Sequence, residues 1–298
     1  MPVIQVEHLH KRYGDTVAVD DVSLEVHRGE IFGVLGRNGA GKTTTVEIIG
    51  GLRRPDAGTV RVLGLDPVRD RARLREVVGL QLQESQLQPR IAVREALDLY
   101  ASFYPDPADP AALLDELGLT DRAGTRFEQL SGGQKQRLSV ALALVGNPQV
   151  AILDELTTGL DPHARRDTWE VVERIRARGV TIVLVTHLME EAERLCDRIA
   201  LIDAGRVVAT GTPTELVARA TVEQVLRFRP SAPVPPGLLD GLGATTERDG
   251  ELEVRGRDNV LQDVLVALDR HGIRPENLRL EQSSLEDAFV ALTSPLEV

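Results

Sequence analysis

Short apolar runs and alternating apolar and polar positions recur over the first two-thirds of the chain. They predict β-strands at residues 3–6, 18–26, 30–35, 59–63, 77–82, 150–153, 181–185, 199–202 and 207–209. Apolar positions three and four residues apart predict helices from about residue 42 and at 93–103, 111–117, 131–145, 162–178 and 188–196. Strands and helices alternate in the second half, which is typical of a parallel sheet covered by helices. The opening strands instead predict an antiparallel appendage.

This alternation breaks between residues 219 and 237, where four prolines predict a linker. We therefore expect a first domain at 1–219, a linker at 220–236 and a C-terminal accessory domain at 237–298, with 224 as its alternative start. The order β-α-β-β-α-β-α, with a short helix near Leu238, predicts a small α+β ferredoxin-like unit plus one helix. An apolar face within 285–293 either packs in its own domain, which we favour, or docks a partner.

Composition narrows the class of protein. The 298 residues are 42% hydrophobic and 27% charged, which indicates a folded globular chain. The longest uncharged stretches, such as 138–151, contain polar residues, Gly and Pro, so we expect no membrane span and no secretory signal. The single Cys196 excludes an internal disulfide and fits a reducing cytoplasm. A net charge of −11 disfavours nucleic acid as a partner.

A glycine-rich turn follows the strand predicted at 30–35 and precedes a helix. Its residues are Gly36, Arg37, Asn38, Gly39, Ala40, Gly41, Lys42 and Thr43, followed by Thr44. The glycines let successive amide groups point inward around a phosphate, and the helix N-terminus adds its positive dipole end. We expect Lys42 to bind the terminal phosphates and the Thr43 hydroxyl to ligate Mg²⁺. The turn therefore predicts a nucleotide-phosphate site.

Two carboxylates end the apolar strand predicted at 150–153. Asp154 and Glu155 would emerge at the carboxyl end of a parallel strand, beside the same crevice as the phosphate loop. There we expect Asp154 to hold Mg²⁺ and Glu155 to orient and deprotonate the attacking water. Paired acids after a strand are weak evidence alone because helix N-caps look similar, but beside a phosphate loop they indicate catalysis.

A second anion site is predicted at the start of another helix. Its residues are Ser131, Gly132, Gly133 and Gln134. Ser131 supplies a hydroxyl and the glycines permit close approach, although Ser131 also serves as an ordinary helix cap.

These three motifs, in this order, resemble the nucleotide-binding domain of the ABC ATPase superfamily over about residues 3–216. The resemblance implies an α/β P-loop NTPase fold with an antiparallel β subdomain and a helical subdomain. It implies that Tyr13 stacks on adenine, that Asp161 crosses a dimer interface and that His187 contacts the γ-phosphate. Gln83 matches the glutamine that reaches Mg²⁺ and the attacking water, with Gln81 and Gln86 as alternatives.

The resemblance also implies a function. It predicts an ATPase, with ATP and Mg²⁺, that pairs head-to-tail with a second copy and drives a separate integral membrane permease from the cytoplasmic face of the membrane. The tail segment 283–293 and the segment 197–206 resemble the multidrug and daunorubicin-resistance exporter type, which implies export of drug-like or hydrophobic compounds. Arg37 and Leu156 stand where the family has proline, and we expect Leu156 to loosen the catalytic loop and slow turnover.

Two other classes of protein fit less well. A soluble ABC ATPase of cluster assembly, translation or repair is disfavoured by the C-terminal tail, the acidic balance and the single ATPase unit. A nucleotide sensor without turnover is disfavoured because Glu155 and His187 are both present.

Overall fold

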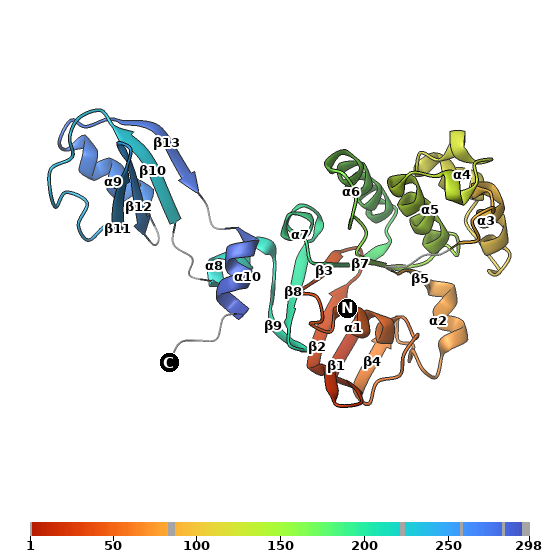
Figure 1. Ribbon diagram of the computed structural model, residues 1–298. Coiled ribbons are helices and arrows are strands. Elements are labelled where there is room, and N and C mark those ends of the chain that lie inside the picture. Colours follow the sequence, from red (N-terminus) through yellow and green to blue (C-terminus); the bar gives the residue numbers. More distant parts are fainter. Residues whose placement is uncertain (1, 83–86, 221–223, 257–258, 282–283, 294–298) are drawn as a thin grey trace. The chain divides into compact units, whose positions relative to one another are not determined.

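The computed structural model of the protein describes residues 2–82, 87–220, 224–256, 259–281 and 284–293 (Figure 1). Its contacts divide the chain into two units, Met1–Pro213 and Thr214–Val298. The range 220–236, which the sequence predicts as a linker, falls inside the second unit, and strand β10 (Gln224–Pro230) occupies part of it. Among the described residues, no helix has the length and apolar character needed to cross a membrane.

A six-stranded sheet forms the centre of the first unit. Its strands follow the order β5 (Val78–Gln81), β6 (Val150–Asp154), β7 (Thr181–Thr186), β3 (Ile31–Leu35), β8 (Arg198–Asp203) and β9 (Arg206–Gly211). The first five strands are parallel and β9 is antiparallel to β8. Every residue of β3, β6 and β7 is buried, as expected for strands covered on both faces. The predicted parallel sheet is confirmed.

A second, antiparallel sheet packs against the first within the same unit. Its order is β2 (Thr16–His27), β1 (Pro2–Tyr13) and β4 (Ala57–Val62), with α1 (Lys42–Ile49) in contact with all three strands. One continuous core joins the two sheets and α1, and it includes the fully buried Ile4, Phe32 and Val46. The antiparallel appendage is confirmed, and its packing fixes α1 at the edge where the phosphate loop lies.

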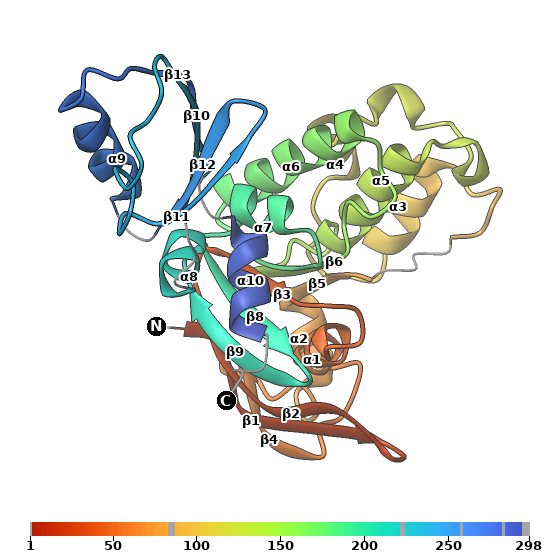
Figure 2. The same cartoon turned by 60° about the vertical axis from the view of Figure 1, so that its left-hand side comes forward.

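Helices cover the parallel sheet and form a group of their own. They are α2 (Arg71–Val77), α3 (Val93–Ala101), α4 (Pro110–Glu116), α5 (Gly132–Leu144), α6 (Pro162–Ala177) and α7 (Met189–Leu195), with short 3₁₀ turns at Thr120–Arg122 and Phe127–Gln129. The helices α3, α4 and α5 lie together as a helical subdomain (Figures 1 and 2). The sequence analysis missed α2, because only Leu74 of that helix is buried and no apolar periodicity marks it.

The second unit contains a four-stranded antiparallel sheet. Its order is β11 (Ala244–Arg248), β12 (Glu251–Gly256), β10 and β13 (Pro275–Glu281), and α9 (Val260–Asp269) contacts it. This is the strand order of a ferredoxin-like sheet, but the predicted short helix near Leu238 is wrong. Residues 236–242 form turns, because prolines precede them and glycines with positive φ interrupt them.

Two further helices, α8 (Pro213–Arg219) and α10 (Leu285–Thr293), flank this sheet in the sequence and lie side by side in both views (Figures 1 and 2). The apolar face predicted for 285–293 is buried at Leu285, Ala288 and Phe289.

Candidate functional site

The loop between β3 and α1 depends on glycines for steric reasons. A Cβ atom on Gly36 would lie 2.1 Å from the carbonyl oxygen of Ile202, and one on Gly41 would lie 2.2 Å from that of Ala18. Gly39 and Gly41 also have φ values of +83° and +99°, a region that disfavours other residues. Only glycine lets the backbone close this tightly, so the loop can turn its amide groups toward a bound anion.

Lys42 is the first residue of α1 and is 5% exposed. Its Nζ donates hydrogen bonds to the carbonyl oxygens of Gly36 (2.9 Å) and Arg37 (3.0 Å). Burial lowers the pKa of Lys42, while the nearby carboxylates of Glu155 and Asp154 oppose that shift. The ammonium group is therefore fixed against the phosphate loop.

A cavity of about 360 Å³ opens over this loop. It is lined by Tyr13, Ala18, Asn38, Gly39, Gly41, Lys42, Thr43, Thr44 and Glu155. Tyr13 and six residues of the predicted phosphate loop therefore face one space, although Gly36, Arg37 and Ala40 do not line it.

The Tyr13 ring lies at one side of the cavity and is 40% exposed. The cationic groups of Lys11 and Arg53 each lie 5.5 Å from its centroid. Such cation–π contacts orient an exposed ring. The sequence analysis missed Lys11 and Arg53, because Arg53 comes from the turn after α1 and only the fold brings it to Tyr13.

Asp154 ends β6 at the same edge of the sheet. It is fully buried, and neither carboxylate oxygen has a hydrogen-bond partner. Burial raises the pKa of Asp154 to about 6; the nearby Thr43 hydroxyl opposes this without reaching hydrogen-bonding geometry, and the Glu155 carboxylate adds to it. A buried, unpartnered carboxylate beside a threonine hydroxyl is the donor set that Mg²⁺ prefers.

Glu155 and His187 meet at this edge because their strands, β6 and β7, are neighbours. The Nδ1 atom of His187 lies 3.3 Å from Oε1 of Glu155. Glu155 has a left-handed backbone with φ of +49°, and its N–H donates to the carbonyl oxygen of Val185 at 2.9 Å. A left-handed glutamate is strained, and strain of this kind gathers at functional sites. The fold brings the two predicted catalytic residues together.

The predicted glutamine Gln83 and its alternative Gln86 lie outside the described residues. The other alternative, Gln81, is 3% exposed. Its Oε1 accepts a hydrogen bond from the backbone N–H of Asp154 (3.1 Å), and its Nε2 donates to the carbonyl oxygen of Leu82 (2.8 Å). Gln81 thus ties the end of β5 to the end of β6.

The second predicted anion site lies apart from the cavity. Ser131 caps α5: its Oγ accepts from the N–H of Gln134 (3.3 Å), and the Gln134 side chain accepts from the N–H of Ser131 (3.0 Å). Asp161 caps α6 by accepting from the N–H groups of His163 and Ala164, which lower its pKa. Neither Asp161 nor the segment Ser131–Gln134 lines the cavity that Lys42 lines.

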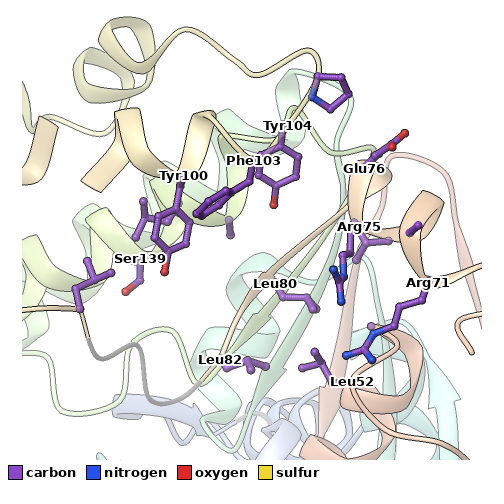
Figure 3. A pocket seen from close by; sticks show the side chains of 17 residues that line it. Leu52, Arg71, Arg75, Glu76, Leu80, Leu82, Tyr100, Phe103, Tyr104 and Ser139 are labelled. Carbon is purple, nitrogen blue, oxygen red and sulfur yellow. The ribbon is translucent and has the colours of Figure 1, made fainter. Parts of the chain in front are cut away.

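A larger pocket of about 700 Å³ has a different set of lining residues (Figure 3). Its lining includes Leu52, Arg71, Arg75, Leu82, Leu87, Tyr100, Phe103 and Tyr104. The rings of Tyr100 and Phe103 lie 5.8 Å apart, and Phe103 is 67% exposed. The sequence analysis missed this pocket, because its walls come from segments far apart in the chain.

Comparisons with known proteins agree with this geometry. Residues 19–158 match the family described as ABC transporter. The chain is 39% identical to daunorubicin resistance ATP-binding protein DrrA3 of Streptomyces coeruleorubidus, over 97% of this chain and 95% of that protein. It is 40% identical to Nod factor export ATP-binding protein I of Paraburkholderia xenovorans, over 97% and 96%.

Solved structures give the same result. The ATP-binding subunit of an ABC transporter matches with a TM-score of 0.66 and 30% identity, over 73% of this chain and 92% of that one. A dimeric ATP-binding cassette in a post-hydrolysis state, bound to ADP and phosphate, matches with a TM-score of 0.64 and 27% identity, over 70% and 98%.

Proposed function

Since this chain belongs to the ABC transporter family, we propose that it powers the export of a drug-like or hydrophobic compound through a separate membrane permease. It is the ATP-binding and ATP-hydrolysing subunit. The observation that carries the proposal is the cavity over the phosphate loop, where Lys42 and Glu155 face the same space. Two relatives of nearly equal length are named for drug resistance and for export, which favours transport over a soluble ABC ATPase role.

The phosphate loop and Tyr13 would together hold ATP. The amides from Gly36 to Thr44 and the Lys42 ammonium would bind the phosphates, while Tyr13 would stack on the base. Thr43 and Asp154 fit Mg²⁺, with Gln83 as the third group inferred from the resemblance. When bound, the ion would neutralise charge on the terminal phosphates.

Glu155 is the general base of the proposed mechanism. Its carboxylate would accept a proton from the attacking water, and His187, 3.3 Å from that carboxylate, would hold the terminal phosphate in register. We expect Glu155→Gln to bind ATP as the wild type does and to lose at least about 100-fold in turnover. Phosphate release and nucleotide titration test this, and a variant that keeps most of its turnover removes Glu155 from the role.

A second copy would complete each site. Ser131, Gly132, Gly133 and Gln134 lie outside the cavity of their own chain, so a second chain placed head-to-tail would bring them to the γ-phosphate, with Asp161 at the interface. The matching cassette with ADP and phosphate is itself described as dimeric. Glu155→Gln with saturating Mg²⁺ and ATP should elute as a dimer in size-exclusion chromatography; a monomer under those conditions contradicts the arrangement.

The pocket in Figure 3 is our candidate for the permease contact, at the inner face of the cell membrane. The exposed Phe103, the half-buried rings of Tyr100 and Tyr104 and the cationic Arg71 and Arg75 suit an amphipathic helix that carries an acidic residue. We expect Phe103→Asp to abolish copurification with the permease while basal ATP hydrolysis continues. Leu99→Asp is the matched control, because Leu99 is 48% exposed but does not line the pocket.

A further inference from the structure

We infer that Glu191 is a positioning residue for ATP hydrolysis, which fastens the loop after Glu155 to the helix that follows His187. The inference rests on the proposed function, because it concerns the same reaction. It gives a role in catalysis to the buried side chain of Glu191, which does not line the nucleotide cavity.

The contacts of Glu191 join three elements through a single oxygen atom. Glu191 is on α7 and is fully buried. Its Oε1 accepts a hydrogen bond from the Thr157 hydroxyl (2.8 Å), in the loop between β6 and α6. The same Oε1 accepts from the indole N–H of Trp169 (3.2 Å), which is on α6. We call Thr157, Trp169 and Glu191 the buried clamp.

Two residues of the clamp are close in the sequence to the two residues of the catalytic edge. Thr157 comes two residues after Glu155, and Glu191 comes four residues after His187. Thr157 is fully buried and Trp169 is 7% exposed, so water cannot replace either hydrogen bond without opening the core. The distance between Glu155 and His187 therefore depends on how the loop is fastened to α7.

This loop needs such a fastening because its backbone is strained. Glu155 has φ of +49°, and a non-glycine residue keeps that conformation only where its surroundings impose it. The loop has leucine at 156, so no proline ring restricts its backbone. The hydrogen bond from the Thr157 hydroxyl to the buried Glu191 side chain can supply that restriction.

Thr157→Val tests the clamp, because valine keeps the shape and removes the hydroxyl. We expect kcat for ATP to fall about tenfold or more while KM changes less than about twofold, since Thr157 does not line the nucleotide cavity. Thr157→Ser should restore kcat to within about threefold of wild type. Thr168→Val is the matched control: Thr168 is equally buried on α6, but its hydroxyl donates only to Ala164 of its own helix.

Glu191 itself gives a second pair of variants. Glu191→Gln keeps an oxygen that can accept both hydrogen bonds, and Oε2 of Glu191 has no partner to lose, so we expect most of kcat to remain. Glu191→Ala removes both bonds and should lower kcat at least as far as Thr157→Val. The double variant Thr157→Val with Glu191→Ala should be no slower than Glu191→Ala alone.

The outcomes separate the inference from the proposed function. A wild-type protein that hydrolyses ATP, with Thr157→Val indistinguishable from Thr168→Val, overturns the inference alone. Equal losses of kcat for Glu191→Gln and Glu191→Ala, or multiplicative losses in the double variant, also overturn it. A wild-type protein without Mg²⁺-dependent hydrolysis overturns the proposed function and the inference with it.

Discussion

Asp154→Asn should change how the stability of the nucleotide-free protein depends on pH. The pKa of the Asp154 carboxyl is raised from 3.8 to about 6, chiefly by burial. Because one pKa unit corresponds to about 1.4 kcal/mol, ionising this group costs about 3 kcal/mol more in the folded chain than in the unfolded chain. The folded state binds the proton more tightly, so this contribution to stability is present below about pH 4 and is lost as the pH rises through about 6.

The measurement compares the two proteins across that window. Urea unfolding, followed by the fluorescence of the single tryptophan, Trp169, gives the free energy of unfolding in EDTA from pH 4 to pH 8. We expect the wild-type value minus the Asp154→Asn value to fall by about 2.4 kcal/mol between pH 4 and 7, because the carboxyl of the unfolded chain is already partly ionised at pH 4. Subtracting the two free energies of unfolding removes the contributions of other titrating groups and any pH-independent effect of the amide side chain.

Asp56→Asn is the control, because Asp56 is exposed and its pKa is lowered, first by the hydrogen bond from Lys11. Its stabilising contribution is present above the unfolded pKa of 3.8 and is lost only as the pH falls below that value, so this difference should stay nearly flat from pH 4 to 8. A wild-type minus Asp154→Asn difference that is flat from pH 4 to 8 would refute the view that Asp154 is a buried carboxylate without a partner.

Three further predictions concern the nucleotide cavity. Gly41→Ala should weaken ATP binding more than about tenfold in a titration, because its Cβ would meet the Ala18 carbonyl oxygen at 2.2 Å; Gly124→Ala, with nothing within 4 Å, should bind as wild type does, and equal affinities would contradict the steric argument. Tyr13→Ala should raise the Kd for ATP about fivefold, the equivalent of about 1 kcal/mol of stacking, while Tyr13→Phe should leave it within about twofold; a larger loss for Phe would place the effect on the hydroxyl. Removal of Mg²⁺ by EDTA should abolish phosphate release and leave ATP bound, and hydrolysis that persists in EDTA would contradict a metal role for Asp154.

Local patterns in the sequence predicted the elements on which the site is built. The strands at Val150–Asp154 and Thr181–Thr186 contain continuous apolar runs of four residues, which are typical of strands buried on both faces of a parallel sheet. The phosphate loop was predictable because its glycines and Lys42 act within eight consecutive residues. Together these patterns placed Asp154, Glu155 and Lys42 at one edge of the parallel sheet.

Features that depend on contacts between distant segments could not be predicted in this way. The hydrogen bond from Thr157 to Glu191 joins residues that are 34 positions apart. No sequence pattern around either residue predicts that the two side chains are in contact. The pocket in Figure 3 combines Leu52 with Phe103, which only the fold brings together. The short helix expected near Leu238 failed for a local reason, because prolines and glycines there favour turns.

The two hydrogen bonds that Lys42 makes within its own loop have a consequence for ligand entry. An ammonium group has three N–H donors, and the carbonyl oxygens of Gly36 and Arg37 take two of them. The third N–H donor remains for the phosphate of an incoming nucleotide. Because the Lys42 side chain is already held in place, it loses little conformational entropy when that phosphate binds. Arginine would carry the same charge, but its planar guanidinium group does not have the three-donor geometry of an ammonium group. Lysine and arginine are therefore not interchangeable at position 42.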